Sequence, residues 1–297
     1  NKKIYSAIKQ AVNDNASNKI SIKSLLVLSI SFLKFFRFRN LNLYLKLLYS
    51  SKKKPWNKSL FLDLFLHDIH MGLIKNDLNF SSIFLNAGAH IQHHYFFNMM
   101  QKSIKNPQWY LDQKFNPAEE LFEVYDRIIG NYLELFEEKV IIATGLSQEL
   151  SDNPVFYYRL KNHKNFFEKI GINFHNILPR MSRDFLITFK SNEDAIEAAN
   201  KISLIQDQLG NKLFEQVENK EGSLFVSLTY PYEIDEKTTV ILENFKFSLK
   251  EHVAFVALKN GIHSEKGYLF TSENILSKDT PSFHIKKIFE IINKYFL

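Results

Sequence analysis

The sequence predicts an α/β fold: a mostly parallel sheet with helices on both faces, and a small inserted α+β unit. Residues 139–144 are almost continuously apolar, which indicates a strand buried on both faces, as in parallel sheets. Polar residues follow this run and also the apolar run at 83–85. Ligands of α/β proteins bind where such strands end. From about residue 151 the pattern changes to short strands and two helices, which predicts the inserted unit at 151–248.

Composition bounds the functions available to the chain. The 297 residues permit one large domain, or a core with a smaller companion. The net charge of +6 is spread along the chain, and the only basic run, Lys52 to Lys54, is typical of a solvated loop, so we expect no nucleic-acid partner. There is no cysteine, which excludes disulfides and thiolate metal sites. We expect a cytoplasmic chain, and since residue 1 is Asn rather than Met, we expect a fragment or a processed product.

Residues 24–49 carry apolar side chains at helical spacing. Lys34, Arg37 and Arg39 interrupt the run, so no transmembrane segment is expected. Two interpretations remain. A pair of core-facing helices broken near Asn40 is favoured over a basic amphipathic helix that lies on a membrane surface.

A helix is predicted over residues 59–73, and it carries Asp63 and His67 on one face because they are four residues apart. That spacing could hold a metal ion. A buried Asp–His pair or a solvated helix end is the favoured interpretation.

The stretch from Leu85 to Tyr95 gives the strongest local signal. It follows the predicted strand at 83–85 and holds three of the ten histidines of the chain, namely His90, His93 and His94. A ligand site at a strand end explains them. An amphipathic helix whose histidines cap it or pack in the core explains them equally well.

Later elements follow from turn and cap signals. Residues 97–117 are predicted to be an irregular loop, and Pro117 is predicted to open a helix that runs to about residue 137, with Glu119 and Glu120 in its first turn. Residues 164–170 are predicted to form a helix closed by Gly171. The core is therefore assigned to 1–150 and 249–297, and the inserted unit to 151–248.

Three pieces occur in a distinctive order. A strand is followed by Asn86-x-x-x-His90, a second strand by Thr144-Gly145-Leu146-Ser147, and, after the inserted unit, comes Gly261-Ile262-His263-x-x-x-Gly267. Over roughly residues 60–297 this order resembles the C-terminal half of the alkaline phosphatase superfamily, especially its type I phosphodiesterase and nucleotide pyrophosphatase branch. The resemblance implies an alkaline-phosphatase-like core whose N-terminal part is missing from this chain.

The resemblance also implies a metal site. Asn86, His90 and His263 fall on positions that hold one divalent ion, zinc in that family, and two imidazoles with an oxygen ligand suit zinc. Gln92, His93 and His94 are further polar groups beside that site, which could complete the coordination or contact substrate, and in an enzyme His93 or His94 would act on the substrate or leaving group. The family's second metal site is lost, because Gly145 and Leu146 replace its Asp-His pair; Thr144 and Ser147 are the polar groups left there for substrate.

Two classes of function follow. The first is a metal-dependent hydrolase or transferase of phosphate or sulfate esters, acting on a small-molecule or glycan phosphoester. Arg180 and Arg183 are its candidate phosphate ligands, since guanidinium groups pair bidentately with phosphate, although they could equally brace a surface turn by ion pairing with Asp184. The second is a non-catalytic member of the superfamily that binds an anionic or sugar-phosphate ligand.

Overall fold

The computed structural model describes residues 21–74, 80–100, 106–136, 140–180, 183–272 and 282–296. Within these residues the fold is α+β, and the prediction of a mostly parallel α/β sheet is wrong. The strands form four small sheets of two to four strands, and every pairing whose register is described is antiparallel. Contacts divide the chain into two units, 26–152 with 260–297, here the helical unit, and 1–25 with 153–259, here the sheet unit.

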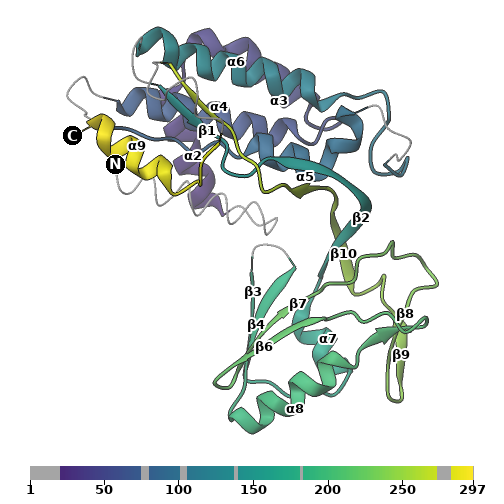
Figure 1. The fold of residues 1–297 in the computed structure, drawn as a ribbon. Helices are drawn as coiled ribbons and strands as arrows, with labels where there is room; N and C mark the ends of the chain where they lie inside the picture. The colour runs from purple at the N-terminus through teal and green to yellow at the C-terminus, as the bar shows by residue number, and fades with distance from the viewer. Residues whose placement is uncertain are drawn as a thin grey trace. The chain divides into compact units, whose positions relative to one another are not determined.

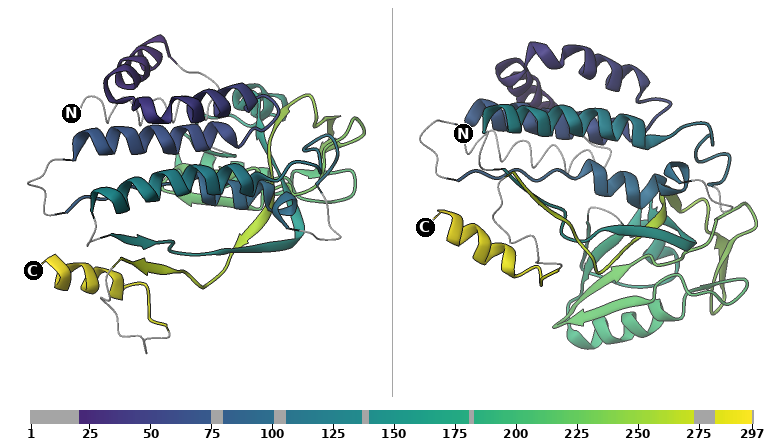
Figure 2. Two further views of the ribbon diagram at one scale, coloured as in Figure 1. Left: turned by 90° about the horizontal axis from the view of Figure 1, so that it is seen from above. Right: turned by 45° about the horizontal axis from the view of Figure 1, so that its top comes forward.

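The helical unit contains most of the helices (Figures 1 and 2). They are α2 (Ile22–Phe35, which begins in residues assigned to the other unit), η1 (Phe38–Asn40), α3 (Leu41–Ser50), α4 (Asn57–Leu73), α5 (Ala87–Met99), α6 (Pro117–Leu135) and α9 (Lys287–Phe296). The predicted break near Asn40 is confirmed, since η1 separates α2 from α3. The start of α6 is also confirmed: Pro117 opens it, and the Asn116 side chain accepts a hydrogen bond from the Ala118 amide.

Aromatic and aliphatic side chains fill the core of the helical unit. Phe32 of α2 packs against Tyr44 of α3 and Phe61 of α4, with ring centroids 5.1 and 6.1 Å apart. Trp56 and Leu64 are completely buried. This packing holds α2, α3 and α4 together and presents one face of α4 to α5 and α6.

Two predicted strands explain why the fold class was wrong. Residues 83–85 form no strand, and Phe84 is 79% exposed. The run at 139–144 yields only β1 (Ile141–Ala143), which pairs antiparallel with β11 (Leu269–Thr271) and is not fully buried. A continuous apolar run shows that a segment is hydrophobic, but it does not specify the direction of a strand partner.

The sheet unit is built on the order β3-β4-β7-β6, with β3 (Asn176–Pro179), β4 (Asp184–Thr188), β6 (Gln216–Lys220) and β7 (Ser223–Ser227). A second sheet has the order β5-β8-β9, with β5 (Gln206–Asp207), β8 (Thr239–Leu242) and β9 (Phe245–Ser248). Helices α7 (His163–Lys169) and α8 (Asn192–Ser203) complete it. Gly171 follows α7 with a φ of +70°, which favours glycine and confirms the predicted helix end.

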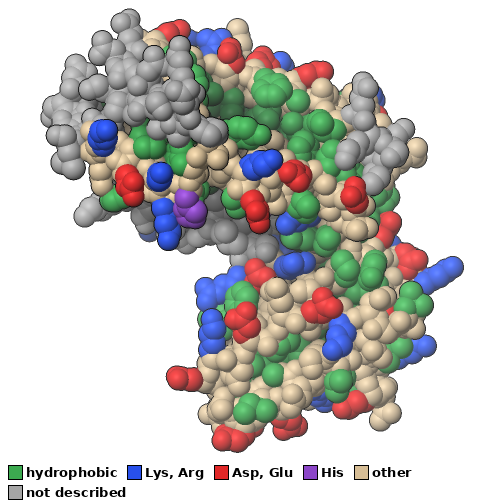
Figure 3. All heavy atoms as spheres, in the orientation of Figure 1, with side chains coloured by type: hydrophobic (Ala, Val, Ile, Leu, Met, Phe, Trp, Pro, Cys, Tyr) green, Lys and Arg blue, Asp and Glu red, His purple; other side chains and the backbone are tan. Residues whose placement is uncertain are grey.

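Two long strands, β2 (Gln148–Leu160) and β10 (Val253–His263), pair with each other, and each contributes residues to both units. The surface carries many hydrophobic side chains beside charged ones (Figure 3). Among the described residues, none of the helices has the length and apolar character needed to cross a bilayer.

Candidate functional site

Helix α5 carries the predicted histidine stretch, and its first turn is anchored by two residues of the neighbouring helices. The Asp63 carboxylate of α4 accepts hydrogen bonds from the amides of Asn86 and Ala87, at 3.2 and 2.8 Å. The Tyr125 hydroxyl of α6 accepts from the Gly88 amide and donates to Asp63, both at 2.9 Å. These bonds satisfy the amides that a helix start leaves without partners, so α5 is fixed in place at its N-terminal end.

Burial opposes ionisation of both anchoring groups. Desolvation raises the pKa of Asp63, against the lowering effect of its hydrogen bonds from Ala87, Asn86 and Tyr125. Desolvation and the Asp63 charge raise the pKa of Tyr125. The anchor is therefore a buried hydrogen-bonded pair at the base of the histidine helix.

A kink divides α5 just after the histidines. Tyr95 has φ −131° and ψ 15°, outside the helical range. The Asn260 side chain of β10 lies at the kink, where it accepts from the Phe96 amide at 2.9 Å and donates to the His94 carbonyl at 3.3 Å. Asn260 thus replaces helical hydrogen bonds and joins the end of β10 to α5.

The end of β10 brings a fourth histidine to this helix. His93 lies against His263 with ring centroids 4.7 Å apart, and its Nδ1 donates to the carbonyl of Gly261, 168 residues away, at 3.2 Å. A side chain at Gly261 would collide with the backbone of Gln92, so the close approach requires glycine. His90 and His94 continue the cluster, with centroids 4.8 Å apart. We call His90, His93, His94 and His263 the histidine cluster.

The environments of the four rings differ. His90, His93 and His94 are half-buried, whereas His263 is exposed. Burial lowers the pKa of His90, and the neighbouring His93 lowers it further, so His90 is a neutral imidazole at pH 7. The Gly261 carbonyl can only accept, so His93 carries its proton on Nδ1. Donation of the second ring N–H to a backbone carbonyl is the usual arrangement of a metal-binding histidine.

Gln148, at the start of β2, contributes a buried oxygen beside the cluster. Its Nε2 donates to the Ala89 carbonyl at 3.1 Å, while its Oε1 is buried and has no hydrogen-bond partner among the described residues. That oxygen faces Gly261, since a Cβ added there would approach it closely. The sequence indicated a polar turn here but did not single out Gln148; its position at a strand end was the available signal.

The other residues implied by the resemblance have varied surroundings. Asn86 is exposed at the N-cap position of α5, and its side chain makes no capping bond. Gln92 is half-buried, with its backbone against Gly261. Thr144 pairs with Tyr268 through its amide and its hydroxyl, and the Ser147 carbonyl accepts from the Ser264 amide at 2.9 Å. Thr144 and Ser147 therefore hold the ribbon that ends beside His263.

Arg180 and Arg183 belong to the sheet unit, whereas the histidine cluster belongs to the helical unit. Arg180 is exposed, and its amide donates to the Asp184 carbonyl. Arg183 lies over the Tyr157 ring, 4.2 Å from its centroid. The Asp184 carboxylate accepts from the Ser227 hydroxyl at 2.6 Å. Arg183 thus has an aromatic neighbour that the sequence did not indicate.

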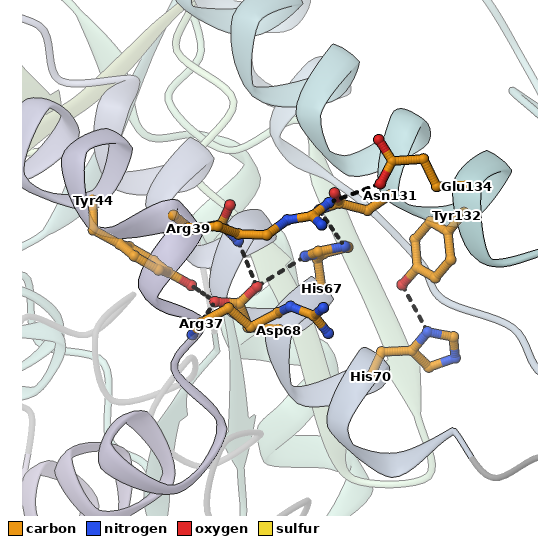
Figure 4. A network of polar contacts seen from close by, with 10 residues as sticks. Arg37, Arg39, Tyr44, His67, Asp68, His70, Asn131, Tyr132 and Glu134 are labelled. Atoms are coloured by element: carbon orange, nitrogen blue, oxygen red, sulfur yellow. Dashed lines mark hydrogen bonds and ion pairs between the residues drawn. The ribbon is translucent and has the colours of Figure 1, made fainter.

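A second polar cluster lies inside the helical unit (Figure 4). The buried Asp68 carboxylate accepts from the Asn40 amide group, the Tyr44 hydroxyl and His67 Nδ1, at 2.7, 3.0 and 3.0 Å. Asn131 Nδ2 lies 3.2 Å from His67 Nε2. His67 therefore has Asp68, rather than Asp63, as its carboxylate partner. These contacts join η1, α3, α4 and α6, which indicates a structural role.

The spacing of the histidine rings bears on metal binding. Within the described ranges, no group of three or more His, Asp or Glu side chains is arranged to hold a metal ion. Two imidazoles on one zinc ion place their ring centres about 5 Å apart, given Zn–N bonds of about 2.0–2.1 Å. The His93–His263 and His90–His94 pairs have that spacing.

Comparisons of the chain with protein-family models, with curated proteins and with solved structures found no match.

Proposed function

We propose that this chain acts on phosphate esters, as a metal-dependent hydrolase or transferase, at a site built on the histidine cluster. The observation that carries the proposal is the contact between His93 and His263, which come from α5 and from the end of β10. Imidazole is a typical ligand of zinc and related ions, and this contact joins histidines that lie 170 residues apart in the sequence.

The donor set fits one divalent ion better than two. His93 and His263 supply two imidazoles at suitable spacing, and the buried Gln148 oxygen, which lies beside Gly261, is a further donor. Such a set leaves positions for a phosphate oxygen or water. A bound divalent cation would polarise a phosphoryl oxygen there.

The chain's own residues position these donors. The Gly261 carbonyl fixes the tautomer of His93, and Asn260 fixes the bend of α5 that follows His94. His90, neutral because of its burial, can accept a proton or donate one through its other ring nitrogen. We assign no nucleophile among the described residues.

Calorimetric titration with Zn²⁺ or Co²⁺ tests metal binding. We expect one site per chain, and we expect His93→Ala and His263→Ala each to weaken the affinity by about 10- to 100-fold, because each removes one imidazole. His284→Ala, on an exposed segment, is the matched control. If the wild-type chain binds neither ion, the proposal is wrong.

Turnover of bis(p-nitrophenyl) phosphate and p-nitrophenyl phosphate by the zinc-loaded chain tests catalysis. Turnover that disappears in the His93→Ala and His263→Ala variants supports the hydrolase.

Binding without hydrolysis is the second candidate, and one observation favours it. Among the described residues no side chain is assigned as a nucleophile, and the Thr144 hydroxyl is engaged with Tyr268. Binding of inorganic phosphate to a metal-loaded chain that shows no turnover would establish this function instead.

A further inference from the structure

Helices α2 and α3 expose an apolar face that the histidine cluster does not use. On α2 the exposed side chains Leu26, Ile30 and Leu33 fall at i, i+4 and i+7, and on α3 Leu41, Leu45 and Leu48 repeat that spacing. Phe38 between the helices is 84% exposed, and Tyr49 is 92% exposed. We call these eight residues the α2–α3 face. Scattered exposed leucines are ordinary, but a stripe along two consecutive helices marks an interaction surface.

The orientation of α2 strengthens this interpretation. Ser31 is buried, and its hydroxyl has no hydrogen-bond partner among the described residues, while Leu33 is 82% exposed. A helix that only needed to cover the core would bury the leucine and expose the serine. Phe32 and Phe35 pack inward, so the helix is held in this orientation by its aromatic side chains.

The charges around the face identify its partner. No Asp or Glu occurs between Asp14 and Asp63, while residues 21–58 contain nine Lys or Arg side chains. Arg39 and Lys46 pair with Glu134 and Glu123 of α6. Lys52 and Lys53 are exposed and form no ion pair with another described residue. Leucine and phenylalanine on one face, with lysines and no acidic residue in the same segment, is the composition of a helix that lies in an anionic membrane interface.

We propose that the α2–α3 face docks the helical unit onto an anionic lipid surface, with its leucines in the headgroup and acyl boundary and its lysines against lipid phosphates. The face lies on the surface, and neither helix crosses the bilayer. This inference stands independently of the phosphate-ester proposal, since it involves none of the same side chains.

Co-sedimentation of the full chain with vesicles tests it. We expect binding to phosphatidylcholine vesicles that contain 30% phosphatidylglycerol, and much weaker binding to pure phosphatidylcholine. Lys52→Gln with Lys53→Gln is expected to lower the affinity about 25-fold, at about fivefold for each lysine. Leu45→Gln with Leu48→Gln is expected to lower it by at least about tenfold, because the apolar contact is lost.

Matched control variants distinguish binding through the α2–α3 face from non-specific binding to vesicles. Leu209→Gln and Lys220→Gln change exposed residues of the sheet unit and should leave vesicle binding unchanged. All substituted side chains are exposed, so circular dichroism should show native helix content in every variant.

Three outcomes would overturn the proposal. They are no binding to anionic vesicles, equal binding to neutral vesicles, and a wild-type dimer that the Leu45→Gln/Leu48→Gln variant converts to a monomer in sedimentation velocity. The last outcome would identify a second copy of the chain as the occupant of the face.

Discussion

Asn260 shows how much structure one side chain determines in this molecule. It is completely buried, and its carbonyl oxygen and amide nitrogen bond to Phe96, His94 and Asn106. A buried amide with partners on both sides contributes stability, whereas an unpaired one costs about 1–3 kcal/mol. The same rule applies to the buried oxygen of Gln148, which has no partner among the described residues and can accept a hydrogen bond or coordinate a bound group.

His163 provides a residue-scale prediction about pH. Burial, with the nearby Arg159 charge, lowers its pKa from 6.5 to about 4, and its ring packs 4.7 Å from that of Phe185. Between these two values the unfolded chain binds a proton that the folded chain does not, so the free energy of unfolding falls as pH falls. We expect a loss of about 2 kcal/mol, allowing for partial exposure.

Denaturation of wild-type and His163→Gln chains at pH 7 and pH 4 measures this difference. The variant should lose that part of the pH dependence, while the exposed-site control His284→Gln should keep it. A histidine NMR titration that finds the pKa of His163 near 6.5 would contradict the prediction.

At the scale of elements, helix ends could be predicted from the sequence, whereas the packing partners of the strands could not. Cap and turn residues predicted the start of α6 and the end of α7, because proline at a helix start and glycine after a helix act through the backbone of a few neighbouring residues. The predicted strands at 83–85 and 139–144 failed, because what an apolar segment packs against depends on distant residues. The histidines were visible as a cluster, but only the fold shows that His93, rather than His90, lies against His263.

Loss of the anchor of α5 is expected to destabilise the start of that helix. Asp63→Ala removes the acceptor for the amides of Asn86 and Ala87 and leaves the Tyr125 hydroxyl without its carboxylate. We expect a loss of about 2–3 kcal/mol in the free energy of unfolding, and faster hydrogen exchange at the start of α5. Urea denaturation and amide exchange measure both effects. Asp126→Ala, on the exposed side of α6, is the control, and an equal loss there would refute the anchor.

At the scale of the whole molecule, the two units have separate cores. Phe185 and its buried neighbours belong to the sheet unit, while Leu64 and Trp56 belong to the helical unit. An inserted unit was predicted at 151–248 because alternating strands and a capped helix differ from long apolar helices, and the contacts assign 153–259 to the sheet unit. The parallel sheet was inferred from the apolar run at 139–144 and from the resemblance, and neither encodes the antiparallel pairing that the structure has.

Separate cores predict separate unfolding. Phe185→Ala should lower the stability of the sheet unit by about 3–5 kcal/mol, and Leu64→Ala that of the helical unit by about 2–5 kcal/mol. Calorimetry should show two transitions, each shifted by only one substitution. One transition shifted equally by both would show that the units unfold together.

The contact between His93 and Gly261 has a kinetic consequence. These residues are 168 positions apart, and nearly all of the sheet unit lies between them in the sequence. Closing so long a loop is slow, because its entropy cost precedes the contacts that it makes possible. The histidine cluster therefore forms late in folding, after the intervening chain has had time to complete its own core. If the cluster binds a metal ion as proposed, the recovery of metal binding during refolding would report loop closure, and it should lag behind the recovery of helix content.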